Sequence, residues 1–153
     1  METFIVFKVS LCIFAPIMRE KIIKKSAELF LTLGFKSVTM DDIANEMGIS
    51  KKTIYVNFEN KTKLVEAVTF SLFENICDGI DCIYESSTNP IEELYDIKMY
   101  VMNHLKNERT SPQYQLKKYY PRIYEVLKNK QFDKMHGSVK ESLQKGIKSH
   151  LFR

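Results

Sequence analysis

A group of side chains suited to nucleic-acid binding lies between residues 51 and 57. Lys51 and Lys52 carry ammonium groups, Thr53 and Tyr55 carry hydroxyl groups, and Asn57 carries an amide. Ammonium groups attract phosphate oxygens, whereas hydroxyls and amides can bond to phosphates or to base edges. On one open face of a helix, this set predicts contact with DNA. The alternative interpretation is a helical hairpin with a solvated face, and periodicity alone favours neither.

The apolar residues around this group predict a short helix that follows a tight turn. Ile54 and Phe58 are four residues apart, so both point to the same inner face. Ser50 is a favourable N-cap for a helix that begins at Lys51. Gly48 stands where a preceding helix would end with a left-handed residue.

The preceding helix is predicted to begin after Thr39. Thr39 is a good N-cap, and Asp42, three residues later, can return a hydrogen bond to it. Ile43, Ala44 and Met47 fall on one face of this helix. Two short helices joined by a tight turn form a helix-turn-helix, whose second helix enters the major groove of DNA.

From Lys21 to about Phe70, the sequence resembles the N-terminal domain of TetR-family transcriptional regulators. The matching elements are Ile22, Ala27, Leu29, Phe30 and Gly34-Phe35, then Thr39 to Ala44, then Gly48-Ile49-Ser50, and finally Tyr55-Val56-Asn57-Phe58 with Lys61 and Leu64. Each element alone is weak, but their common order and spacing make a specific signal. The resemblance implies an all-α fold, with a three-helix helix-turn-helix DNA-binding domain followed by a helical effector and dimerisation domain.

The resemblance also implies which side chains contact DNA. They are Thr39, Ser50, Lys51, Lys52, Thr53, Tyr55, Asn57 and Lys61. Two of them depart from the family pattern, because Lys52 stands where glycine is common and Asn57 where histidine is common. The extra lysine strengthens the attraction to phosphate, while Asn57 keeps a donor and loses the possible positive charge.

Composition and length agree with this interpretation. The chain has 153 residues and a formal net charge of +4, which favours nucleic acid without proving it. We expect an apolar N-terminal extension at residues 1–17, the DNA-binding domain at 18–64 and a helical domain at 65–153. Residues 1–17 are too short to span a bilayer and lack the basic start of a signal peptide. We therefore expect a natural start at Met18, a cytoplasmic protein and no membrane contact.

The second domain reads as a series of helices separated by prolines. A helix is expected from Lys61 to about Tyr84, with breaks at residues 86–90, at 110–112 and at Pro121, and a last helix near Val139 to Ile147. The resemblance implies two further helices that pair across a two-fold axis, and the chain is expected to be incomplete there. The alternative function is therefore a truncated helical module that binds a ligand or a partner, with impaired specific DNA binding.

Within the family, the resemblance implies a ligand-responsive regulator, more often a repressor, that binds a palindromic operator in double-stranded DNA as a homodimer. It also implies a small-molecule effector, whose identity the sequence does not give. Candidate pocket residues are Tyr95, Met99, Met102, Tyr119 and Tyr120, although such residues at helical spacing are more often plain core. The cysteines and histidines lack metal-ligand spacing, and no catalytic constellation occurs, so we expect no cofactor, no metal and no enzyme.

Overall fold

Seven α-helices build the chain in the computed structural model, and the ranges it describes contain no strand. It describes the backbone of residues 2–86, 89–105 and 111–151, and the side chains of residues 17–86, 89–104 and 111–151. The helices are α1 (Glu2–Leu33), α2 (Met40–Met47), α3 (Lys51–Asn57), α4 (Lys61–Ser86), α5 (Pro90–Leu105), α6 (Pro112–Tyr119) and α7 (Pro121–Lys148). The predicted all-α class is confirmed. Among the described residues, none of the helices has the length and apolar character needed to cross a bilayer.

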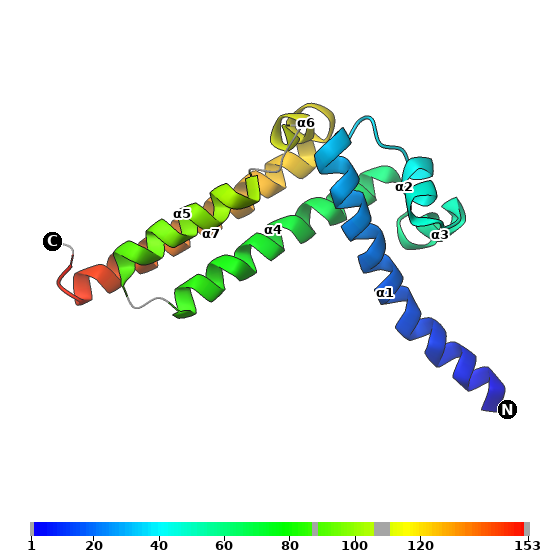
Figure 1. Ribbon diagram of the computed structural model, residues 1–153, viewed down its shortest axis with the longest axis horizontal. Coiled ribbons are helices and arrows are strands. Elements are labelled where there is room, and N and C mark those ends of the chain that lie inside the picture. Colours follow the sequence, from blue (N-terminus) through cyan, green and yellow to red (C-terminus); the bar gives the residue numbers. More distant parts are fainter. Residues whose placement is uncertain (1, 87–88, 106–110, 152–153) are drawn as a thin grey trace.

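The helices form a small head and an elongated bundle (Figure 1). The short helices α2 and α3 lie beside α1, which also packs against α4. Helices α4, α5 and α7 pack against one another along the bundle, and α6 lies at the junction with the end of α1. The head that carries α3 therefore lies at one end of the molecule.

One apolar core joins the head to the start of the bundle. Phe30 and Phe35 are almost completely buried at the end of α1, with ring centroids 5.1 Å apart. Leu64, Val65 and Val68 of α4 are also inaccessible to solvent. Because the head residues Ile43 and Ile54 belong to the same buried cluster, the orientation of α2 and α3 depends on α1 and α4.

The ends of α2 and α3 follow the sequence predictions. Thr39 and Asp42 form a reciprocal capping box at the start of α2. Gly48 has φ +63° and ends α2 in the left-handed region, where glycine carries no Cβ penalty. The Ser50 hydroxyl then accepts a hydrogen bond from the backbone N–H of Thr53.

Two helices are longer than predicted. The helix expected from residue 19 is continuous with residues 2–18 in α1, whose first fourteen residues contain neither glycine nor proline to stop it. The last helix, expected near Val139, is part of α7 and begins at Pro121. Gly137 lies inside α7, because a single glycine costs only about 1 kcal/mol relative to alanine and does not end a packed helix. Parts of the predicted breaks, at residues 87–88 and at Thr110, lie outside the described residues.

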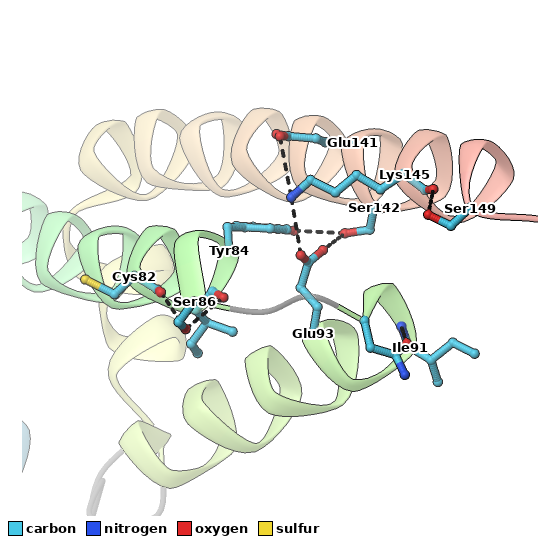
Figure 2. Close-up of polar contacts among 11 residues, drawn as sticks. Cys82, Tyr84, Ser86, Ile91, Glu93, Glu141, Ser142, Lys145 and Ser149 are labelled. Atoms are coloured by element: carbon cyan, nitrogen blue, oxygen red, sulfur yellow. Dashed lines mark hydrogen bonds and ion pairs between the residues drawn. The ribbon is translucent and has the colours of Figure 1, made fainter. Parts of the chain in front are cut away.

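A polar cluster connects α5 to α7 at the far end of the bundle (Figure 2). The Glu93 side chain is buried, and its carboxylate accepts hydrogen bonds from Ser142 and Lys145. Buried charge is tolerated when it is paired in this way, so the cluster fixes the register of the two helices.

Candidate nucleic-acid interface

Helix α3 presents one polar and basic face to solvent. Ile54 is completely buried and Phe58 nearly so, which fixes the inner face of the helix. Lys51 and Lys52 are exposed, and Tyr55 is 44% exposed. The predicted division of α3 into an inner apolar face and an outer polar face is therefore correct.

Val56 is a surface residue of α3 that the sequence reasoning missed. Its side chain is 78% exposed. Helical spacing places Val56 and Lys52 on the same side, opposite Ile54. The available signal was a β-branched apolar residue that does not fit the inward spacing of Ile54 and Phe58. In a recognition helix such a residue can contact the methyl group of thymine.

The hydroxyls predicted to contact DNA serve as helix caps. The Ser50 and Thr53 hydroxyl oxygens are 2.8 Å apart, and Ser50 Oγ accepts from the Thr53 N–H at 3.1 Å. The Thr39 hydroxyl donates to Asp42 Oδ2 at 2.8 Å and accepts from the Asp42 N–H at 3.1 Å. The hydrogen bond from the Thr39 backbone N–H to the carboxylate is the main cause of a lowered pKa at Asp42. A phosphate near Thr39 must therefore share this hydroxyl with Asp42.

Lys51 forms an ion pair with an acidic residue of α2. Its Nζ lies 2.7 Å from Asp41 Oδ2, and both side chains are about half exposed. The hydrogen bond to Asp41 raises the pKa of Lys51, so the ammonium stays charged. Exposed ion pairs contribute little to stability, and a phosphate can replace Asp41 as the partner.

Lys61 lies at the start of α4 and is bound to the chain itself. Its Nζ donates to the backbone carbonyl of Lys36 at 3.2 Å. Partial burial lowers the pKa of Lys61, while the nearby charge of Asp42 acts in the opposite direction. Lys61 thus connects the α1–α2 loop to the start of α4, a contact that its predicted role at phosphate did not include.

Asn57 also differs from the expected outward orientation. Its Nδ2 donates to the Thr53 carbonyl of the same helix at 2.8 Å, and its side chain is half-buried. The short amide side chain competes for a nearby backbone acceptor, a common property of asparagine. Lys52, by contrast, is exposed and has no ion-pair partner among the residues that the structure describes.

The five candidate pocket residues occupy different places. Tyr95, Met99 and Met102 lie on α5 with 60%, 37% and 50% of their surface exposed. Tyr119 lines an open groove of about 300 Å³ between α6 and the α1–α2 loop, and Tyr120 packs edge-on against a core phenylalanine. Because three of the five face solvent and two lie at α6, a common ligand cavity for them stays a prediction.

Metal chemistry finds no obvious place in the part of the chain that is described. No group of three histidine, cysteine or acidic side chains there is arranged to hold a metal ion. Cys77 is partly buried, and this burial raises the pKa of its thiol. A raised thiol pKa reduces the thiolate fraction and hence the reactivity.

Sequence comparison identifies relatives of the head and of the helix that follows it. Residues 22–68 match the family described as "Bacterial regulatory proteins, tetR family". The chain is 28% identical over 81 residues to the HTH-type transcriptional repressor KstR2 of Mycolicibacterium smegmatis, covering 53% of this chain and 40% of that one. It is 31% identical over 78 residues to the biofilm operon negative transcriptional regulator IcaR of Staphylococcus aureus, covering 51% and 42%. The chain therefore spans less than half the length of these curated relatives.

Solved structures share the fold over a larger part of the chain. A fatty acid degradation regulator, FadR, from Bacillus halodurans superposes with a TM-score of 0.72 at 18% identity, covering 88% of this chain and 71% of that one. A TetR-family regulator from Mesorhizobium loti gives 0.73 at 21% identity, covering 89% and 71%. At these identities the likeness shows the fold alone, a helix-turn-helix head followed by a helical domain. Together with the match over residues 22–68, it shows that the chain belongs to the TetR family of bacterial regulatory proteins.

Proposed function

We propose that this chain is a DNA-binding transcriptional regulator of the TetR type, which reads the major groove with α3. The observation that carries the proposal is the orientation of α3. Burial of Ile54 leaves Lys52, Tyr55 and Val56 exposed on the outer side of a helix-turn-helix. Residues 18–64 form the DNA-binding unit, and residues 65–153 form the helical effector and dimerisation unit. Regulators of this family bind DNA and are not enzymes.

Within this interface the side chains divide into two roles. Lys52 and Val56 point away from the core and read base edges, since one offers ammonium donors and the other an apolar contact for a thymine methyl. Thr39, Ser50, Lys51 and Tyr55 lie around them and bind phosphate, which sets the register on the duplex. Thr53, Asn57 and Lys61 contribute from the edge, after exchanging the contacts they make within the chain.

The regulator acts as a ligand-responsive repressor on a palindromic operator. One α3 reads only a half-site, so a two-fold operator requires two copies of the chain. Two sequence relatives are named as a repressor and a negative regulator, which supports repression here. A small molecule bound in the helical unit shifts the population of the DNA-competent state by its differential affinity.

The proposal is tested by fluorescence anisotropy with a labelled duplex from the region upstream of the gene, titrated at several salt concentrations. Lys52→Ala removes a contact in α3, whereas Lys98→Ala removes the same charge from a position on α5, away from the head. We expect Lys52→Ala to weaken binding and to change the salt slope by about one, and Lys98→Ala to change neither.

The competitor experiment separates the proposed regulator from the alternative. Binding that survives an excess of random duplex supports sequence recognition by α3. Binding removed equally well by random duplex, with equal losses in Lys52→Ala and Lys98→Ala, would contradict it. The chain would then act as a helical ligand- or partner-binding module, for which the exposed apolar side chains on α7 are the favourable observation.

A further inference from the structure

Helix α7 carries an exposed row of apolar side chains, formed by Phe132, Met135, Val139, Leu143 and Ile147, which we name the α7 ridge. The last four follow one another at intervals of four residues and are 61%, 41%, 46% and 55% exposed. Phe132, about one turn earlier, is 61% exposed. A groove of about 510 Å³ runs along these residues and is otherwise lined by His136, Lys140 and Gln144.

The ridge is separate from the face that α7 uses inside the molecule. Ile123, Leu127, Ser142 and Gly146 are buried on that inner face, where α7 packs against α4, α5 and α6. The five ridge side chains together expose on the order of several hundred Å² of apolar surface, a size at which patches on single chains are often functional. A standard protein interface buries roughly 800 Å² on each partner, of which somewhat more than half is apolar. The ridge therefore has the size of the apolar part of one interface.

We propose that the α7 ridge packs against the α7 ridge of a second copy of this chain. Side chains at intervals of four form the i±4n ridge of a helix, and two such ridges interdigitate at about −50°, the commonest class of helix packing. A two-fold interface also requires one surface that complements itself. The ridge meets this requirement because its central residues, Val139 and Leu143, are apolar, and Lys140 at its edge can extend its ammonium into water.

The direction of this pairing follows from the position of α7 in the molecule. Helix α7 begins beside α6, at the end that carries α2 and α3, and runs to the opposite end of the bundle (Figure 1). Two copies of α7 that cross while running in the same general direction place both α3 helices at one end of the dimer. This direction rests on the proposed function, since a two-fold operator must meet both heads, whereas the contact between the ridges does not.

Sedimentation equilibrium of the full chain at micromolar concentrations tests the contact. Leu143→Glu and Val139→Glu place a charge at the centre of the ridge, and Val126→Glu is the matched control, since Val126 lies on α7 outside the ridge and is 47% exposed. We expect dimers for the wild type and Val126→Glu, and monomers for the two ridge variants. All three positions are accessible in a single copy, so circular dichroism should show unchanged helix content.

A disulfide experiment tests the register independently. In a background with Cys12, Cys77 and Cys82 changed to serine, Leu143→Cys should form a dimer under mild oxidation, and Val126→Cys should not. A wild-type monomer, or a dimer that Leu143→Glu leaves intact, would overturn the proposed interface. A ridge-dependent dimer that fails to bind specific DNA would support the interface and contradict only the proposed function.

Discussion

Glu93 gives the sharpest test of what holds the bundle together. Its side chain is 1% exposed, and its two carboxylate oxygens have different partners (Figure 2). Ser142 donates to Oε1 at 2.5 Å, and Lys145 Nζ lies 3.3 Å from Oε2. Tyr84 closes the cluster, with its hydroxyl 3.5 Å from that of Ser142 and its ring beneath the Lys145 ammonium.

The change to make is Lys145→Met, which keeps the approximate length of the side chain and removes its charge. Removing one partner of a fully buried ion pair costs roughly 3–5 kcal/mol. Because the Lys145 side chain is 39% exposed, water already screens part of the attraction, and we expect a loss of about 1–2 kcal/mol. In a Glu93→Gln background the charge to be compensated is gone, so the same change should cost less than about 0.5 kcal/mol.

The assay is urea unfolding followed by circular dichroism for the four proteins of this double-mutant cycle, which isolates the pairwise free energy. Lys148→Met is the control, because Lys148 is an exposed lysine on the same helix, and surface changes of this kind stay within about 0.5 kcal/mol. If Lys145→Met cost the same free energy in the wild type and in the Glu93→Gln background, the argument from buried charge would be wrong.

Three further predictions concern other parts of the fold. A Cβ on Gly79 would collide with the Tyr100 hydroxyl, so Gly79→Ala should destabilise the chain by about 1–3 kcal/mol in urea melts, and adding Tyr100→Leu should recover part of the loss. Ser26 is completely buried, and its hydroxyl has no hydrogen-bond partner among the described residues, so Ser26→Ala should leave stability unchanged or raise it by up to about 1 kcal/mol in the same assay; a clear loss would reveal a hidden partner. Asp41→Asn should tighten DNA binding in anisotropy titrations, because it frees the Lys51 ammonium and removes a negative charge near the phosphates; unchanged affinity would show that Lys51 does not reach DNA.

Local sequence signals predicted the head well because each one has a short-range cause. Thr39 and Asp42 are three residues apart and form the capping box that this spacing permits. Gly48 is left-handed because the chain must turn there between two helices. The boundaries of the long helices were harder to predict. The last helix was expected only near Val139, whereas the packing of α7 against α4 and α5 keeps it continuous from Pro121.

The contacts of the candidate site depended on geometry that no motif contains. The bond from Lys61 to the Lys36 carbonyl spans 25 positions, and it exists because the core brings the α1–α2 loop against the start of α4. The pair of Lys51 and Asp41 joins two helices across the turn. A family resemblance assigns such residues to DNA and says nothing about partners that they hold in the free chain.

These internal partners change how the basic residues should be counted. The ammonium of Lys51 already has a carboxylate, that of Lys61 has a carbonyl, and Thr39 shares its hydroxyl with Asp42. Binding of DNA at these positions is therefore an exchange, whose free energy is the difference between a phosphate and the partner that is released. Lys52 has no ion pair to give up within the described part of the chain, so its phosphate or base contact adds fully to affinity. The specificity of this regulator should consequently depend more on Lys52 and its neighbours on the open face of α3 than on the number of lysines in the head.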